Sequence, residues 1–184
     1  LLIAAAEKVL QGSYRYVDGE ERLYLPDRKY VKINLASSGR QEVVWVFNLL
    51  FYYLIENKKV FLIVEEPESH LYPDSQEIMG QVLALMLNCG SSVLTTTHSP
   101  YILGTFNYLL AAGQVQKKHT EEVKTKVHKR FWISPSDTNA QHIHDGIMEP
   151  AVDQEDSITL IKNELIDGAS HSINEKCDLC LGFL

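Results

Sequence analysis

The chain has 184 residues, of which 45 % are hydrophobic and 22 % are charged, which suits a folded domain with one sizeable core. Its net charge of −7 argues against a nucleic-acid-binding surface spread over the whole chain, while a local basic patch stays compatible with it. The three cysteines are too few for a disulfide framework and favour a reducing compartment. Cys177 and Cys180 have C-x-x-C spacing, but no second pair accompanies them, and we interpret them as ordinary thiols.

The sequence predicts no membrane segment and no signal peptide, and therefore a cytoplasmic protein. Its longest apolar run, residues 43–55, is interrupted by Asn48 and is shorter than the about 20 residues that span a bilayer. The chain begins with Leu1, within a helical pattern and without Met. We expect it to be a fragment of a longer protein.

The N-terminal part predicts a helix followed by short strands. Residues 1–10 have helical character and end before Gly12. Two alternating segments flank Asp18-Gly19, which is the signal of an antiparallel hairpin, and a third strand candidate follows. These strand candidates are residues 14–17, 22–25 and 30–35.

The middle of the chain predicts alternating helices and strands. A long apolar helix that is buried on most sides precedes a continuous apolar strand of the sheet centre, and a second buried strand follows the next helix. Short loops between them indicate a βαβ unit. The fold class is therefore α/β, with a mainly parallel sheet flanked by helices and a small antiparallel hairpin near the N-terminus. The predicted elements are helix 40–56, strand 60–64, helix 73–88, strand 92–97 and helix 99–112.

The chain changes character after Gly113. Residues 116–130 hold six basic side chains, partly offset by Glu121 and Glu122. A solvated linker or helix face accounts for this run most simply, and a salt-dependent affinity for DNA would support nucleic-acid contact instead. Further on, the sequence predicts a strand at 131–134, an acidic loop at 136–156 and helical spacing at 157–166.

Two adjacent carboxylates, Glu65 and Glu66, end the first apolar strand. The carboxyl ends of parallel strands open into the crevice where α/β proteins bind ligands. In a phosphate-cleaving site, one carboxylate can support Mg²⁺ through water and the next can orient the attacking water. A solvated acidic turn is the alternative when this feature is taken alone.

Two further polar groups follow the same logic. His98 ends the segment after the second strand, where it could donate a hydrogen bond to a phosphate oxygen, although a helix start explains it equally well. Ser37, Ser38 and Gly39 precede a helix, whose free N–H groups and dipole favour anions. An ordinary helix cap is the simpler interpretation of these three residues alone.

The order of the three features resembles the AAA family ATPases of the ABC type. Ser-Ser-Gly at a helix start corresponds to the signature motif, the strand ending in Glu-Glu-Pro-Glu to Walker B, and Thr-His-Ser-Pro to the switch histidine. The run Glu66-Pro67-Glu68-Ser69-His70-Leu71-Tyr72-Pro73 resembles the branch that includes RecF-like, SMC-like and overcoming-lysogenization-defect (OLD) proteins. The resemblance covers residues 1–112.

The resemblance implies a role for each matching residue. Glu65 would support Mg²⁺ through water, Glu66 would be the general base, and His98 would contact the γ-phosphate. Ser37, Ser38 and Gly39 would contact ATP bound by a second subunit. The D-loop across that interface would be Ser69, His70, Leu71 and Tyr72. The resemblance thus implies ATP and Mg²⁺ as cofactors and a second ATPase subunit as partner.

One part of the family pattern is missing. No G-x-x-x-x-G-K-[ST] sequence occurs in the chain. This Walker A loop supplies most phosphate contacts in such proteins, so we expect this chain alone to be inactive. We expect residues 1–113 to form part of an ATPase domain, followed by an extension, residues 114–184, of unknown role.

Two functions remain open at this point. The first is an ATPase fragment, working in DNA repair or phage defence, that hydrolyses ATP at a head-to-tail dimer interface. The alternative is a non-hydrolysing regulatory lobe that supplies the signature motif in trans or partners a nuclease. DNA is a possible partner, whereas the chain itself carries no nuclease pattern: its acids beyond residue 136 are scattered.

Overall fold

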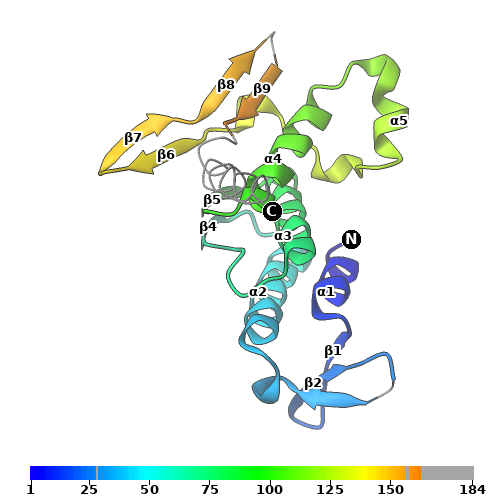
Figure 1. The fold of residues 1–184 in the computed structure, drawn as a ribbon. Coiled ribbons are helices and arrows are strands. Elements are labelled where there is room, and N and C mark those ends of the chain that lie inside the picture. The colour runs from blue at the N-terminus through cyan, green and yellow to red at the C-terminus, as the bar shows by residue number, and fades with distance from the viewer. Residues whose placement is uncertain (28, 156–157, 163–184) are drawn as a thin grey trace, which may run out of the picture. The chain divides into compact units, whose positions relative to one another are not determined.

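The computed structural model describes residues 1–27, 29–155 and 158–162. The chain divides into two compact units, Leu1–Thr97 and His98–Leu184, which are described one at a time. Helices and short strands alternate along the chain (Figure 1), and one strand pair is parallel, so the α/β class is confirmed. Cys177 and Cys180 lie outside the described residues, whereas Cys89 is exposed.

The first unit begins with helix α1 (Leu2–Leu10) and a three-stranded antiparallel sheet in the order β1-β2-β3. The predicted hairpin is confirmed, because Asp18 and Gly19 form its turn with positive φ angles of 54° and 79°. The third predicted strand is shorter than expected, and its second half is a 3₁₀ turn, Ile33–Leu35. The strands are β1 (Ser13–Val17), β2 (Glu20–Tyr24) and β3 (Tyr30–Lys32).

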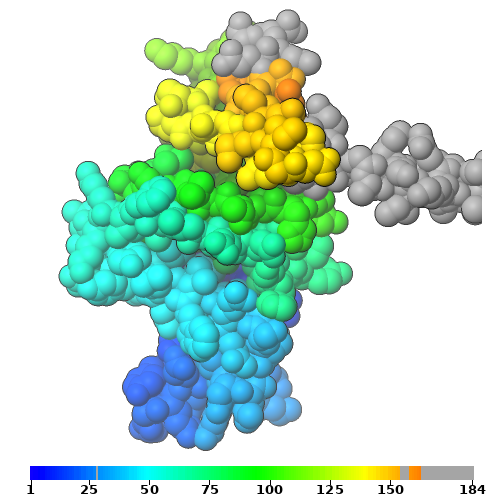
Figure 2. All heavy atoms as spheres, turned by 90° about the vertical axis from the view of Figure 1, so that its left-hand side faces the viewer, coloured from blue at the N-terminus to red at the C-terminus, as the bar shows by residue number. Residues whose placement is uncertain are grey.

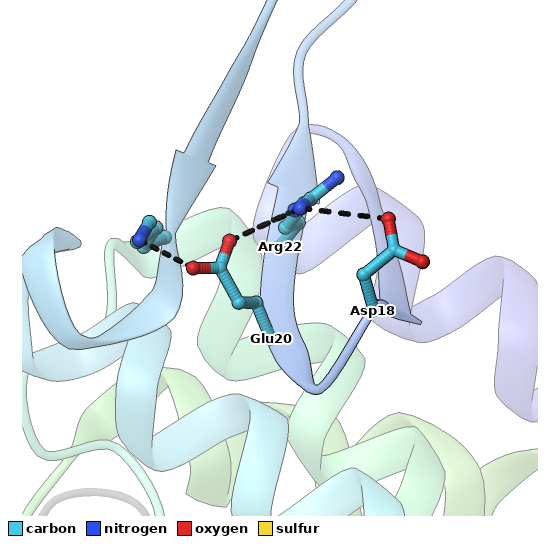
Figure 3. A network of polar contacts seen from close by, with 4 residues as sticks. Asp18, Glu20 and Arg22 are labelled. Atoms are coloured by element: carbon cyan, nitrogen blue, oxygen red, sulfur yellow. Dashed lines mark hydrogen bonds and ion pairs between the residues drawn. The ribbon is translucent and has the colours of Figure 1, made fainter.

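Charged side chains connect the turn and the strands of this sheet. Arg22 lies between two carboxylates (Figure 3), at 3.1 Å from Glu20 and 4.0 Å from Asp18. Lys32 donates to the other Glu20 oxygen and so joins β3 to β2. Lys32 first, and Arg22 second, lower the pKa of the Glu20 carboxyl. Because these side chains are in contact with solvent, we expect the network to add little to stability and to help fix the register of the three strands instead.

The rest of the first unit is a βαβ arrangement, as predicted. Strands β4 and β5 pair in parallel, with Phe61 opposite Ser92 and Glu65 opposite Thr96. Helix α3 starts with Pro73 in its first turn and buries one continuous apolar side, which forms the centre of this unit. The elements are α2 (Ser38–Ile55), β4 (Phe61–Glu65), α3 (Pro73–Asn88) and β5 (Ser92–Thr96).

One face of the β4–β5 pair is open. Phe61 and Ile63 are 65 % and 62 % exposed, although parallel strands are normally covered on both faces, so the prediction of two buried strands is wrong for this face. The prediction that α2 is buried on most sides is wrong for the chain as it stands, because Trp45 and Tyr52 reach solvent while Val43 and its neighbours pack inward. Among the helices of the described residues, none has both the length and the hydrophobicity that crossing a bilayer requires.

The second unit is built on helix α4 (Pro100–Gly113) and contains two antiparallel hairpins. The strand predicted at 131–134 is wrong, because the chain forms a 3₁₀ turn, Lys129–Phe131, with Trp132 after it. The loop predicted at 136–156 and the helix predicted at 157–166 are also wrong over their described parts, which hold strands. These are β6 (Gln141–His144), β7 (Ile147–Pro150), β8 (Val152–Glu155) and β9 (Ile158–Ile161).

The β6–β7 hairpin shows why its residues were predicted as a loop. All its residues except His142 are exposed, and its atoms (yellow in Figure 2) lie at the surface. Without a buried face there is no hydrophobic alternation to signal strands. The hairpin depends instead on its tight turn, where Asp145 and Gly146 have φ angles of 48° and 77°.

Two amide side chains, one within α4 and one directly after it, pair with the backbone of β9. The Asn107 side chain accepts from Ile161 N–H and donates to Ile161 C=O, both at 2.7 Å. Gln114 does the same for Thr159, at 2.8 and 2.9 Å. The two amides thus substitute for a neighbouring strand along one edge of β9. They fix the β8–β9 hairpin to the helix.

We expect Asn107→Ala to destabilise the second unit by about 1–3 kcal/mol, because it leaves two partly buried backbone groups of Ile161 without their partner. Thermal unfolding measures the loss, and hydrogen exchange of the Ile161 amide localises it. Gln116→Ala is the matched control, since that side chain is exposed and makes no described hydrogen bond. Equal effects of the two substitutions would contradict a stabilising role for the pairing of Asn107 with the Ile161 backbone.

Candidate active site

The two carboxylates predicted from the sequence stand at the carboxyl end of β4. Both are exposed, and Glu65 is the last strand residue, opposite Thr96 of β5. The Glu66 N–H donates to the Thr96 carbonyl at 2.9 Å, which extends the parallel ladder by one residue. Glu66 then has a φ of +44°, a left-handed conformation that is uncommon outside glycine and turns the chain sharply away from the strand.

The loop after Glu66 is an ordered pair of turns. Ser69 N–H donates to the Glu66 carbonyl at 2.9 Å, and Leu71 N–H donates to the Glu68 carbonyl at 3.0 Å. The Ser69 hydroxyl also donates to the Glu66 carboxylate at 3.3 Å. His70, like Glu66, has a positive φ, of 60°. These contacts hold the predicted D-loop against the predicted general base.

Glu68 is a structural member of this site to which the sequence analysis assigned no role. Its residue is only 5 % exposed, and the Thr97 hydroxyl donates to its carboxylate at 2.7 Å. A buried carboxylate is costly without such hydrogen bonds. It therefore ties the loop to the chain that leaves β5. The sequence feature that could have pointed to Glu68 is its place directly after Pro67, within the run Glu66–Pro73 on which the family resemblance rests.

The serines of the predicted signature motif stand at the start of α2. Ser37 precedes the helix and accepts from Gln41 N–H at 3.1 Å through its carbonyl, while its side chain makes no cap hydrogen bond. The Gln41 side chain donates to the Ala36 carbonyl at 2.8 Å and so fixes the approach to the helix. Ser37 and Ser38 are exposed. Their hydroxyls are therefore available for contact with another molecule.

Gly39 brings the predicted signature motif and the predicted D-loop into direct contact. It is buried in the first turn of α2, and a Cβ there would lie 2.5 Å from the carbonyl oxygen and 3.1 Å from the Cβ of His70. Only glycine permits this approach. Glycine is required here because of this close contact and not because of the backbone conformation, since Gly39 does not have a positive φ.

A small pocket of about 40 Å³ lies where these segments meet. Its wall combines the start of α2, the end of β4, the loop after it and one residue of α3. It holds little more than water-sized groups, so within this unit it is a junction rather than a nucleotide site. The lining residues are Gly39, Glu42, Val43, Val46, Val64, Glu65, Glu66, Pro67, Ser69, Leu71 and Met79.

His98 is the first residue of the second unit and is exposed. It directly precedes Ser99, whose side chain accepts from the N–H groups of Tyr101 and Ile102 at 3.1 and 3.3 Å. Ser99 is thus the cap of α4, as a helix start predicts. His98 stands immediately before this cap.

The charge of the site is negative, and it can support a divalent cation only partly. No group of three or more metal-ligating side chains occurs in the described part of the chain. Glu65 and Glu66 offer two exposed carboxylates at this strand end. One or two carboxylates are the protein share of a typical Mg²⁺ site, in which water and phosphate oxygens supply the other ligands.

Two comparisons with known proteins found matches to this chain. A family model described as "AAA ATPase domain" matches residues 1–103. Three solved chains match the structure, among them the SMC head domain from Thermotoga maritima, with 17 % sequence identity and a TM-score of 0.41. That match covers 56 % of this chain and 40 % of the SMC head, so the chain spans less than half of that domain's length. No curated protein matches the chain.

Proposed function

This chain belongs to the AAA ATPase domain family, and from that premise we propose that it is part of an ATPase that hydrolyses ATP with Mg²⁺ between two subunits. The observation that carries the proposal is the junction at Gly39. There the helix start, the end of β4 and the loop from Ser69 converge within a single unit. We infer that residues 1–113 form the ATPase part and residues 114–184 an extension.

We assign the chemical roles by position. Glu66 would accept the proton of the attacking water, since its exposed carboxylate is held by Ser69 at the end of a strand. Glu65 would hold Mg²⁺ through water, and the ion would neutralise charge on the phosphates. His98 would donate a hydrogen bond to the terminal phosphate. Each role follows the family resemblance, and the local geometry is compatible with the roles of Glu65 and Glu66.

The exposed residues of this region support a dimer around the nucleotide. Ser37 and Ser38 present hydroxyls at a helix N-terminus, where an anion is favoured. Tyr72, at the end of the loop, is 78 % exposed although it is a large side chain. We propose that these residues face ATP and a loop of a second subunit. We further propose that the protein works in the cytoplasm on DNA maintenance or phage defence, with DNA or a nuclease as a further partner.

We propose that the phosphate-binding loop is supplied by another segment. The 184 residues contain no G-x-x-x-x-G-K-[ST], and parallel strands normally have both faces covered, whereas Phe61, Ile63 and Leu94 are exposed here. We propose that the segment carrying this loop covers the β4–β5 pair.

The test measures ATP binding and Mg²⁺-dependent hydrolysis by this chain beside an N-terminally extended gene product that contains a phosphate-binding loop. We expect only the extended protein to bind and turn over ATP. Turnover by the 184 residues alone would show that unrecognised residues hold the phosphates and would overturn the proposed architecture. Binding without turnover by the extended protein would favour the non-hydrolysing regulatory lobe.

A further inference from the structure

The positive charge of the chain is concentrated in one loop of the second unit. We define the basic loop as residues 114–132, between the end of α4 and Ile133. It holds six of the 17 Lys and Arg residues and only two of the 24 Asp and Glu residues, so it carries +4 while the rest of the chain carries −11. Such an asymmetry indicates an anionic partner for this segment.

The basic loop is anchored at its base. The Ile133 N–H donates to the Leu109 carbonyl at 3.1 Å, and Ile133 itself is only 5 % exposed. Gly113 packs directly against the Ile133 carbonyl, where a Cβ would collide. The two ends of the loop therefore meet at α4. Between them the chain projects from the helix, as Figure 1 shows in yellow-green around the short helix α5 (Thr120–Lys124).

The basic loop has a defined internal structure. It contains a 3₁₀ turn, Lys117–His119, the short helix α5 (Thr120–Lys124) and a second 3₁₀ turn, Lys129–Phe131. The Trp132 indole donates to the Val127 carbonyl at 3.0 Å and closes the returning half. The loop is thus ordered before any partner binds, which lowers the entropy cost of binding.

Four lysines of the basic loop point their charge into solvent. They are all exposed, and within the described part of the chain none of them takes part in an ion pair. Lys124 differs, because it pairs with Glu121. No acidic side chain of the loop competes for the four ammonium groups. The four are Lys117, Lys118, Lys126 and Lys129.

We propose that the basic loop binds the phosphate backbone of a nucleic acid, without sequence preference. Lysines are point charges suited to phosphates, and release of condensed counterions drives such binding. A membrane surface is disfavoured, because the loop, described in full, exposes no large apolar side chain that could insert. A protein interface is disfavoured because lysine is depleted in such interfaces, whereas aromatic residues anchor them.

The inference does not depend on ATP hydrolysis, so it is tested on this chain without nucleotide. The titration uses a fluorescently labelled duplex of mixed sequence and the matching single strand, over salt from about 50 to 200 mM. The variant replaces Lys117, Lys118, Lys126 and Lys129 by Gln. The control makes the same change at four exposed lysines of the first unit, Lys8, Lys29, Lys58 and Lys59.

We expect the wild-type chain to bind nucleic acid with a steep salt dependence. The loop variant should bind at least about tenfold more weakly, and its slope of log affinity against log salt should shrink by roughly 0.9 for each duplex phosphate that the loop no longer neutralises. The first-unit variant should keep most of the affinity and the slope, although both variants have the same net charge. Circular dichroism should give wild-type spectra for both, since only exposed side chains change.

Three results would overturn the inference. The first is absence of binding by the wild-type chain at low salt, and the second is an equal loss of affinity in the two lysine variants, which would mean a general charge effect. The third is binding to phosphatidylserine vesicles that is tighter than binding to DNA and depends on the same lysines, which would assign the loop to a membrane surface. ATPase activity enters none of these outcomes, so they leave the proposed ATP hydrolysis untouched and bear only on the proposed DNA partner.

Discussion

Glu66→Gln is expected to abolish ATP turnover in the extended, nucleotide-binding protein while leaving ATP binding in place. Glutamine has the shape of glutamate and can still accept the hydrogen bond from the Ser69 hydroxyl, so the loop should keep its conformation. It cannot accept a proton from water. General base catalysis contributes a factor of about 10²–10⁴ to a rate, and we expect kcat to fall by a factor in that range. Because the assembled site survives, the ATP-bound dimer should accumulate.

The measurement combines phosphate release at saturating ATP with size-exclusion chromatography in the presence of nucleotide. Glu56→Gln is the matched control: it makes the same chemical change on an exposed residue at the end of α2, where turnover should not respond. Near wild-type turnover in the Glu66 variant would remove this residue from the mechanism. Loss of ATP binding together with turnover would assign it a structural role in the loop.

The sequence predicted the first unit well because hydrophobic burial determines it. Helix α3 buries a continuous apolar side and strand β4 is a run of apolar residues, and sequence patterns detect both. The order of motifs also located Glu65 and Glu66 at a strand end. The bond between Glu68 and Thr97 was not predictable, because it joins residues 29 positions apart that no local pattern connects.

The second unit was predicted poorly after α4 because its strands are short and have little buried surface. Residues 158–161 have spacing that also suits a helix, and their strand state depends on pairing with β8 and on amides 45 and 54 residues away in sequence. Single-sequence patterns carry no information about such distant partners. The basic loop shows the same limit, since the charge run was visible but the anchor at Ile133 was not.

Gly39→Ala is expected to destabilise the first unit, although alanine is the better helix former. In a helix interior the exchange would gain up to about 1 kcal/mol from propensity. Here the new Cβ would lie 2.5 Å from the His70 carbonyl, a backbone atom in a loop held by hydrogen bonds, so either the loop or the helix start must shift. Such overpacking typically costs about 1–3 kcal/mol, which exceeds the gain. In the extended protein, the displaced loop should also lower ATP turnover.

Gly104→Ala separates the contact from the propensity. Gly104 also lies inside a helix, α4, but a Cβ there would meet no atom within 4 Å, so this variant should be as stable as the wild type or more so. Thermal unfolding of the chain should therefore shift in opposite directions for the two alanines, by roughly 2–4 °C for each kcal/mol. If both substitutions raise the melting temperature equally, α2 does not rest on the His70 carbonyl. The proposed contact between the start of α2 and the loop at His70, on which the proposed site depends, would then be wrong.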